Sequence, residues 1–257
     1  YLKAISEFEK ANDKKGLAEA LNNIGNIYKR QENYPKALDY FNRSLDIKVE
    51  LQDMRGIGIS YNNLGIIAAL QNDLDNAMQY YQKSLNIFKK LKNKYRIGRL
   101  TYFIGEIYLK QKNYEKALEY FSNALKIRQE VDDKNGVAVC YNRIGLIYLD
   151  TEEYEKAGKM LYLSHKLAIE IQARQIQVEN YLALSKLDSA KGDFASALQY
   201  YKRYNALKDS VYSNEVKREI DRIEAQNEIE KRDNEIELQK ENLKTQKQQQ
   251  RNLIIGI

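Results

Sequence analysis

Two side chains could carry chemistry by their type alone, the single histidine and the single cysteine of the chain. His165 lies in the stretch LSHKLAIE, where the preceding serine imitates the surroundings of a histidine that accepts a phosphoryl group. No proline-containing continuation follows, and its repeat position is that of leucines expected in a core, so we predict a structural role. Cys140 shares its repeat position with Ala20 and Ser60, which predicts packing. A lone cysteine also excludes an intrachain disulfide and a cysteine-based zinc site.

Two short stretches imitate ligand-binding loops without completing them. GIGISY, from Gly56, is half of a nucleotide-binding loop, and its place in the repeat predicts the opening of a helix. VDDKNG, from Val131, lacks the first calcium ligand of an EF-hand loop and is expected to be a turn. The sequence contains no Walker loop, no HExxH motif and no catalytic triad pattern. We therefore expect no catalysis, no metal and no cofactor.

Charge and composition narrow the class of protein. Lys and Arg number 42 and Asp and Glu number 36, a formal net charge of +6, and the two signs alternate without a block of five like charges. This pattern indicates a solvated surface and argues against nucleic-acid binding. One proline and 12 glycines in 257 residues leave long helices uninterrupted, so the composition predicts an all-α fold.

An internal repeat of 40 residues organises the chain. Five segments, LNNIGNIY, YNNLGIIA, TYFIGEIY, YNRIGLIY and YLALSKLD, begin at Leu21, Tyr61, Thr101, Tyr141 and Tyr181. A second set in the same register begins at Asn33, Asp73, Asn113, Glu153 and Asp193. No insertion interrupts the five units.

Each unit is predicted to be a pair of helices, because apolar residues recur at helical spacing in both halves. Asn33, Asp73, Asn113 and Asp193 occupy the expected N-cap of the second helix. There, a side-chain oxygen can accept a hydrogen bond from an otherwise free backbone N–H. Pro35 falls in the first turn of its helix, where the missing N–H costs little.

Small residues mark the place where the two helices of a unit should meet. A glycine in mid-helix costs about 1 kcal/mol against alanine, yet glycine recurs in the first helices and alanine recurs in the second. We expect these columns to allow close approach of the two backbones. The columns are Gly25, Gly65, Gly105, Gly145 and Ser185 in the first helices, and Ala37, Ala77, Ala117, Ala157 and Ala197 in the second.

These motifs resemble the tetratricopeptide repeat family. The first part of the family pattern is a large residue, two spacers, Leu-Gly, two spacers and Tyr, and it is met by Tyr141, Ile144, Gly145 and Tyr148. The second part is an alanine with an aromatic residue four positions later, and it is met by Ala37 with Phe41 and by Ala117 with Phe121. The resemblance covers roughly residues 1 to 210 and implies an α-solenoid, a right-handed superhelix of helical hairpins. The period of 40, against the usual 34 of the family, predicts that both helices are longer.

The same resemblance implies a concave groove, lined by the first helices, that binds a peptide or protein partner. Inward-facing positions of the family fall on Asn22, Asn26, Lys29, Asn62, Arg99, Tyr102, Glu106, Lys110 and Asn142, with Glu19 and Arg30 beside them. The asparagines could hold the main chain of an extended peptide through amide donors and acceptors, or could only solvate the groove. Units two and four add apolar positions, which favour a ligand of mixed character: Ile59, Ile66, Leu70, Val139, Leu146 and Leu149.

After about Tyr204 the register fades, and residues 206–251 form a charged run without glycine or proline, which predicts one long helix. Ile229, Ile236 and Leu243 recur every seven residues, which favours a dimeric coiled coil over a solvated helix. Residues 252–257 resemble the start of a truncated, possible transmembrane segment. The expected organisation is the end of a preceding repeat at 1–16, five repeats at 17–205, the charged helix, and this apolar start.

Repeats, charged helix and apolar start together resemble the sensory region of Bacteroidetes-type sensor histidine kinases and membrane-tethered transcription regulators. This resemblance implies a ligand- or protein-binding sensory module in the periplasm, a homodimer, and a kinase or DNA-binding output module elsewhere in the parent protein. One observation opposes this topology: Lys240, Lys244, Lys247 and Arg251 precede the apolar start, where the positive-inside tendency expects cytoplasm. The alternative is a soluble cytoplasmic adaptor whose repeats bind a partner protein or peptide.

Overall fold

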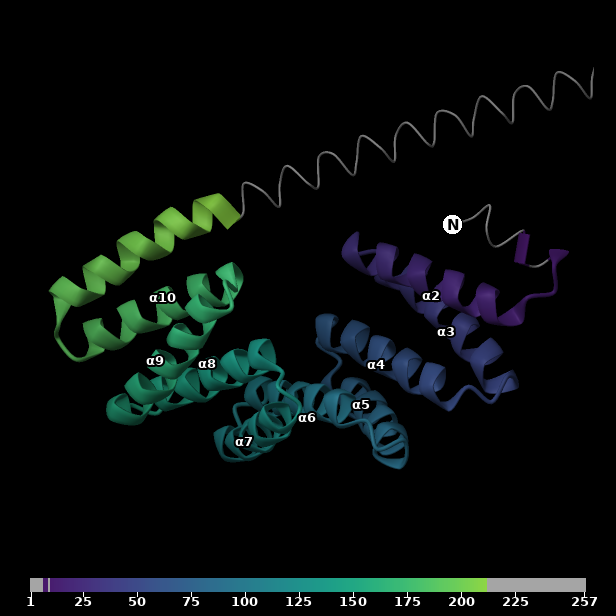
Figure 1. The fold of residues 1–257 in the computed structure, drawn as a ribbon, viewed down its shortest axis with the longest axis horizontal. Helices are drawn as coiled ribbons and strands as arrows, with labels where there is room; N and C mark the ends of the chain where they lie inside the picture. The colour runs from purple at the N-terminus through teal and green to yellow at the C-terminus, as the bar shows by residue number, and fades with distance from the viewer. Residues whose placement is uncertain (1–6, 9, 212–257) are drawn as a thin grey trace, which may run out of the picture. The chain divides into compact units, whose positions relative to one another are not determined.

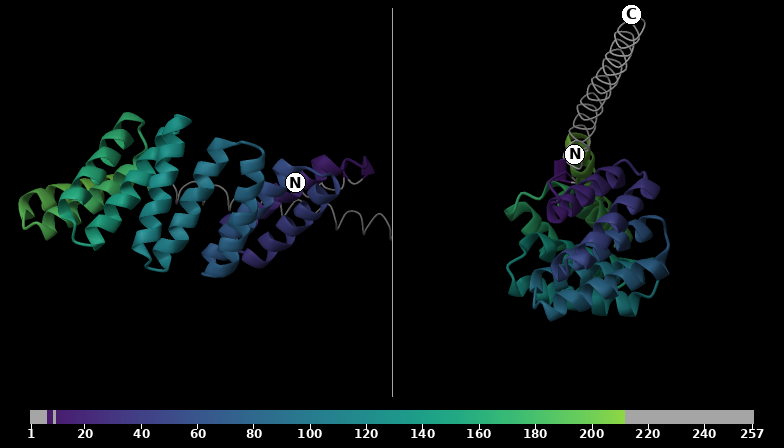
Figure 2. Two further views of the ribbon diagram at one scale, coloured as in Figure 1. Left: turned by 90° about the horizontal axis from the view of Figure 1, so that it is seen from below. Right: turned by 90° about the vertical axis from the view of Figure 1, so that its right-hand side faces the viewer.

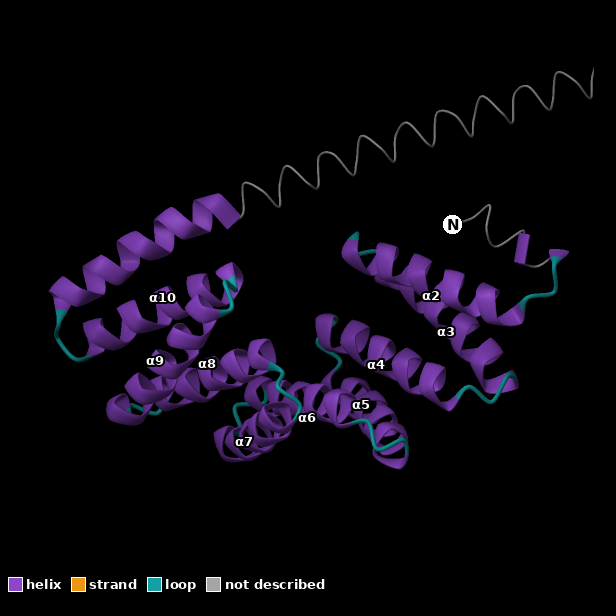
Figure 3. Ribbon diagram, in the orientation of Figure 1, coloured by secondary structure: helices purple, strands orange, loops and turns teal. Residues whose placement is uncertain are grey.

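The computed structural model describes residues 7–8 and 10–211, and all regular secondary structure among them is helical (Figure 3). Two compact units divide the chain, Tyr1–Tyr201 and Lys202–Ile257, and the repeats lie in the first. Helices of 17 residues begin every 20 residues: α2 (Lys14–Arg30), α3 (Tyr34–Glu50), α4 (Met54–Leu70), α5 (Leu74–Lys90), α6 (Lys94–Lys110), α7 (Tyr114–Glu130), α8 (Lys134–Asp150), α9 (Tyr154–Glu170) and α10 (Arg174–Ala190). Residues 194–211 form the next helix. The all-α fold and the two lengthened helices of each unit are thus confirmed.

The linkers between helices are short and repeat one backbone conformation. After α2, the Glu32 N–H donates to the Lys29 carbonyl at 3.1 Å and the Asn33 N–H donates to the Tyr28 carbonyl at 2.9 Å, which is a Schellman motif. Glu32 itself has φ +57°, in the left-handed region that costs an L-residue about 1 kcal/mol or more. The same conformation recurs at Asn12, Gln52, Asn72, Lys92, Lys112, Asp132, Glu152, Gln172 and Gly192. One helix therefore ends and the next begins within three residues.

The predicted caps of the second helices are confirmed. An Oδ1 atom accepts from the N–H three residues later at 3.1–3.3 Å in four linkers: Asn33 from Lys36, Asp73 from Asn76, Asn113 from Lys116, and Asp193 from Ser196. Pro35 lies in the first turn of α3. Glu153 and Ala173 make no side-chain cap, so α9 and α10 begin without this bond.

The glycine column accommodates a side chain of the partner helix. A Cβ on Gly25 would lie 2.6 Å from Cε1 of Phe41, and a Cβ on Gly105 would lie 2.8 Å from Cε1 of Phe121. Both rings are fully buried. In each of these hairpins, the large residue four positions after the alanine lies across the first helix, and the glycine leaves room for it. This contact explains why a costly glycine recurs.

Consecutive hairpins stack side by side within the first unit, and their first helices lie on the inner side of the arc (Figures 1 and 2). Each second helix packs against the first helix of the next hairpin. Phe41 of α3 clusters with Leu64 and Ile67 of α4, and Phe121 of α7 clusters with Ile144 of α8. Because each hairpin buries its apolar face against its neighbours, stability depends on the stack.

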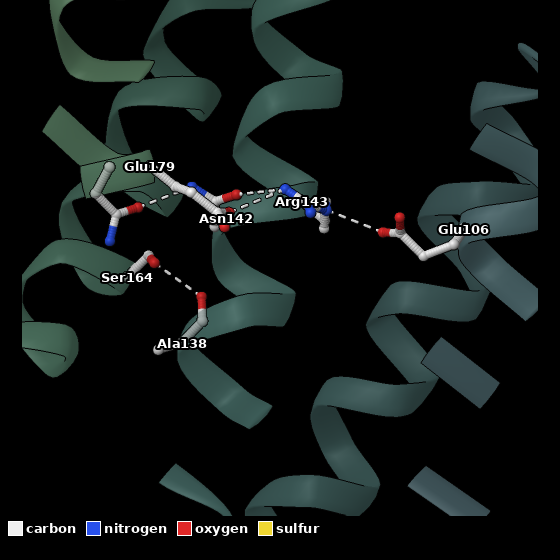
Figure 4. Close-up of polar contacts among 7 residues, drawn as sticks. Glu106, Ala138, Asn142, Arg143, Ser164 and Glu179 are labelled. Atoms are coloured by element: carbon white, nitrogen blue, oxygen red, sulfur yellow. Dashed lines mark hydrogen bonds and ion pairs between the residues drawn. The ribbon is translucent and has the colours of Figure 1, made fainter. Parts of the chain in front are cut away.

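A buried serine joins the two helices in three of the hairpins. Its hydroxyl donates to a main-chain carbonyl of the first helix at 2.7–2.8 Å: Ser44 to Ala18, Ser84 to Gly58, and Ser164 to Ala138, the last drawn in Figure 4. The equivalent residue of the third hairpin is Ala124, which is buried and cannot make the bond.

The two residues that could carry chemistry by type lie in the core, as expected. His165 is 8% exposed and its ring centroid lies 4.8 Å from that of Tyr181. Cys140 is fully buried, and burial raises the pKa of its thiol to about 12. Gly56 lies in the first turn of α4, and Val131 begins the linker before α8, so neither imitated motif forms a ligand-binding loop.

Candidate functional site

A hollow of about 760 Å³ lies where α2, α3 and α4 meet. Three of the expected groove positions, Glu19, Asn22 and Ile59, line it. The other lining residues are Lys15, Ala18, Asn23, Lys48, Leu51, Asp53, Arg55 and Gly56. Cations, carboxylates, amides and apolar surface thus border one space, which suits a ligand group of mixed character.

Lys48 brings a buried charge to the wall of this hollow. It is 6% exposed, and its Nζ donates to Ser60 Oγ at 3.1 Å. Burial lowers the pKa of Lys48, and the negative charges of Asp53 and Glu19 act in the opposite direction. Gly56 leaves room for the side chain, because a Cβ there would lie 2.9 Å from Lys48 Cδ. An ammonium has three donors, so Lys48 can interact with a further group that enters the hollow.

Amide side chains link α2 and α4, the first helices of the first two hairpins, beside the hollow. Asn63 Nδ2 donates to Asn22 Oδ1 at 2.9 Å, and Asn62 Nδ2 donates to Asn63 Oδ1 at 3.4 Å. One turn further along α2, Asn26 Nδ2 donates to the Asn22 carbonyl and Lys29 Nζ donates to Asn26 Oδ1, both at 3.0 Å. Asn62 is only 7% exposed, whereas Asn22 and Asn26 are half-buried and keep part of their surface open.

A second polar cluster on the first helices centres on Arg143 of α8 (Figure 4). Its Nε donates to Glu106 Oε1 at 2.9 Å, and its Nη1 donates to Asn142 Oδ1 at 3.0 Å and to Glu179 Oε2 at 3.3 Å. Asn142 is 1% exposed, and its Nδ2 donates to Asn180 Oδ1 at 2.9 Å. Burial opposes the charge of Arg143, but the neighbouring phenol and carboxylates raise its pKa. The cluster therefore holds α6, α8 and α10 together.

Tyr102 of α6 is part of the core and 8% exposed. The guanidinium of Arg128 lies 4.9 Å from its ring centroid, and Arg128 Nη1 lies 3.8 Å from Asp133 Oδ2. Burial raises the pKa of the Tyr102 phenol. Arg99, half-buried on the same helix, lies over the Phe103 ring at 5.9 Å.

The expected groove residues thus separate into groups. Asn22 lines the hollow, Glu106 and Asn142 belong to the Arg143 cluster, and the exposed Lys110 donates to the Ala69 carbonyl at 2.8 Å. The burial of Asn62, Tyr102 and Asn142 leaves little of their surface for a ligand. Contact of any of these residues with a ligand stays a prediction.

The sequence reasoning missed Lys48, Asn63, Arg143 and Glu179. Two signals could have found the first three. Asn63 and Arg143 directly follow Asn62 and Asn142 in the chain, and Lys48 lies in a column that alternates between apolar and basic residues, with Phe8, Phe88 and Arg128.

The described residues, 7–8 and 10–211, include neither a candidate membrane span nor a candidate metal site. None of their helices is long and apolar enough to cross a membrane, and no group of three or more His, Cys, Asp or Glu among them could hold a metal ion. Of the predicted coiled coil at 206–251, residues 212–251 lie outside the described part, as do the apolar residues 252–257.

The model of a known repeat family matches most of this chain. The family described as "Tetratricopeptide repeat" matches residues 1–50, 16–90 and 96–170. A comparison with curated proteins finds no match.

Solved structures share the fold at low sequence identity. BtubC (BKLC) from P. vanneervenii superposes with a TM-score of 0.70 at 17% identity, over 82% of this chain and 89% of that one. The apo form of RapI gives a TM-score of 0.68 at 18% identity, over 77% of this chain and 73% of that one. A Rap protein complexed with Competence and Sporulation Factor gives a TM-score of 0.60 at 16% identity, over 81% of this chain and 70% of that one.

Proposed function

Because the chain belongs to the tetratricopeptide repeat family, we propose that it is a protein-interaction module whose repeats hold an extended peptide segment of a partner. One observation carries this proposal, the hollow of about 760 Å³ where α2, α3 and α4 meet. Its size is typical of ligand sites, which span about 300–1,000 Å³. A Rap protein that shares this fold is complexed with Competence and Sporulation Factor, which supports the proposal that such a fold binds a partner.

The walls of the hollow indicate how a peptide would be bound. Asn22 and Asn23 offer amide donors and acceptors for a main chain, while Ala18 and Ile59 offer apolar contact for side chains. Arg55 borders the same space and is exposed, so its charge can attract a ligand and bind its carbonyl or carboxylate oxygens.

The test is a selection of short random peptides displayed on phage, panned on the full chain. A selected peptide is then synthesised with a fluorophore, and its affinity is measured by fluorescence polarisation. We expect Arg55→Glu to weaken binding about tenfold or more, because a cation at the edge of the site becomes an anion.

The matched control is Lys126→Glu, which makes the same charge change at an exposed position of the second helix α7. It is expected to leave the affinity unchanged. Equal affinities for the two variants would place the peptide elsewhere, and a selection that yields no binding peptide would contradict the proposal.

A finer proposal concerns the parent protein. We propose that the module senses its ligand for a signal-transduction protein, a two-component sensor kinase or a membrane-tethered regulator, and pairs with a second copy through residues 206–251. The support is the seven-residue spacing of Ile229, Ile236 and Leu243 in the sequence. Membrane attachment and a periplasmic location belong to the same proposal. Light scattering of the full chain should then give a dimer, and a monomer at tens of micromolar would contradict this pairing.

The alternative proposal is a soluble cytoplasmic adaptor that uses the same hollow. The four basic residues at Lys240, Lys244, Lys247 and Arg251 oppose a periplasmic location of the repeats, because such residues are enriched on the cytoplasmic side of membranes. Fractionation of cells that express the parent protein separates the two. Recovery with the membrane supports the sensor, and recovery in the soluble cytoplasmic fraction supports the adaptor.

A further inference from the structure

Two junctions between hairpins follow one plan, 80 residues apart. In the first junction α2 and α3 meet α4, and in the third junction α6 and α7 meet α8. Each contains a long basic residue that is 6% exposed, Lys48 in the first and Arg128 in the third. In each, a glycine makes room for that residue. The equivalent pairs are Asn22 and Tyr102, Lys48 and Arg128, Asp53 and Asp133, and Gly56 and Gly136.

The junctions differ in what lies against the buried cation. In the third, the Tyr102 ring lies against the Arg128 guanidinium, 4.9 Å from centroid to Cζ, and 5.3 Å from the Phe121 ring. In the first, the equivalent of Tyr102 is Asn22, whose side chain accepts from Asn63 instead. Asn22 and Lys48 both line the hollow. The place that a ring occupies in the third junction is therefore open space in the first.

We propose that this hollow takes an aromatic side chain of the bound peptide, which lies against Lys48 as Tyr102 lies against Arg128. This inference rests on the proposed function and names the residue class that the site selects. Ala18, Leu51 and Ile59 supply apolar walls for the ring. The ammonium of Lys48 supplies the positive charge that the face of a ring attracts.

The charges next to Lys48 favour a ring over a carboxylate. Lys15 and Arg55 also border the hollow, but Asp53 and Glu19 are the charges that act on Lys48, and they repel an anion placed against its ammonium. A neutral ring avoids that repulsion and still interacts with the cation through its π face. Compared with phenylalanine, tyrosine adds a hydroxyl that can hydrogen-bond to the amide of Asn22 or Asn23 at the wall.

The experiment starts from a peptide selected on the full chain and replaces each position in turn by Tyr, Phe, Leu and Glu. Fluorescence polarisation measures every affinity. We expect one position at which Tyr and Phe bind about fivefold more tightly than Leu, with Glu weakest. Equal affinities for Tyr and Leu at every position would overturn the inference while leaving peptide binding intact. Absence of any bound peptide would overturn the inference together with the proposed function.

Two variants locate the preference in the hollow. Lys48→Met keeps the length and apolar stem of the side chain but removes its charge. It should abolish the preference for Tyr over Leu while the Leu peptide binds as before.

Asn22→Tyr places on α2 the ring that the third junction carries. By filling the space, it should weaken the binding of all peptides about tenfold or more. Its control, Asn123→Tyr, makes the same change at an exposed position of α7, away from the hollow, and should bind normally. A persisting preference in Lys48→Met, or normal binding by a folded Asn22→Tyr with an unchanged melting temperature, would overturn the inference.

Discussion

The first and third junctions share a backbone plan, and two side chains decide that one is open and the other filled. Tyr102 and Arg128 occupy the third junction with a ring and a guanidinium 4.9 Å apart. The shorter Asn22 and the slimmer Lys48 line a hollow of about 760 Å³ in the first. Because the repeat places both pairs equivalently, the difference lies in side-chain size rather than in backbone geometry. In a repeat array, shorter or slimmer side chains at two columns can therefore leave an open space between hairpins.

Tyr102→Asn should open the third junction and has the largest expected effect. The ring is 8% exposed, so its removal leaves a cavity and exposes Arg128, at a cost of about 3–4 kcal/mol in the free energy of unfolding. Urea denaturation measures the loss. The control is Tyr95→Lys, which introduces the residue found at the equivalent position of the first hairpin, Lys15. Because Tyr95 is 47% exposed, this change should alter the free energy of unfolding by no more than about 0.5 kcal/mol. A loss below about 1 kcal/mol for Tyr102→Asn would show that the ring does not fill the junction.

Gly136→Ala probes how tightly each cation is held. A Cβ there would lie 2.1 Å from Arg128 Nη1, so we expect a loss of about 2 kcal/mol in unfolding free energy. Both substitutions also press on the capping carboxylate, since a Cβ would lie 2.1 Å from Asp53 Oδ2 at Gly56 and 2.3 Å from Asp133 Oδ2 at Gly136. Gly56→Ala should still cost less, because its Cβ would lie 2.9 Å from Lys48 Cδ and Lys48 can shift into the adjacent hollow. Gly158→Ala is the control: its Cβ would meet Leu187 at 3.5 Å, an ordinary contact, and should stabilise by about 1 kcal/mol. Equal losses at Gly56 and Gly136 would contradict the difference in packing.

The serine bonds test a smaller difference between the first and third hairpins. Ser44→Ala should cost about 1 kcal/mol, because it leaves the Ala18 carbonyl without its 2.7 Å donor. Ala124→Ser should raise the free energy of unfolding by up to about 1 kcal/mol, because the new hydroxyl can donate to the Gly98 carbonyl, the equivalent acceptor in the third hairpin. Thermal and urea denaturation measure both. A destabilised Ala124→Ser would mean that the third hairpin packs too tightly for a hydroxyl.

The smallest expected effect is a dependence on pH that belongs to the first junction. Burial lowers the pKa of Lys48 in the folded state below its ordinary value of 10.5. Between these two pKa values the unfolded chain binds more protons, so the contribution of Lys48 to stability rises with pH. The difference in unfolding free energy between wild type and Lys48→Met, measured from neutral pH to about 10.5, should therefore move in favour of wild type. A difference that is flat across this range would mean that Lys48 keeps an ordinary pKa.

Much of the fold followed from the sequence because it depends on local interactions. Asn33, Asp73, Asn113 and Asp193 cap their helices through bonds that reach only three residues along the chain. The glycine column was equally visible, and the sequence predicted close approach of two backbones there. At Gly25, however, the atoms that come close belong to the ring of Phe41, which reaches it from another helix. Of the expected groove residues, Asn22 lines the hollow, whereas Asn142 and Tyr102 are buried by neighbours that the family pattern does not specify.

The sequence by itself determined the repeat period, the helix pairs and their caps, since each follows from residue types that act within one or two turns. Only the tertiary structure decided which positions remain open to a ligand. Exposure at Asn22 or Tyr102 depends on the sizes of side chains on two other helices, such as Lys48 and Arg128, which lie 26 residues further along the chain. That dependence is a property of packing between helices, and a repeat register does not contain it.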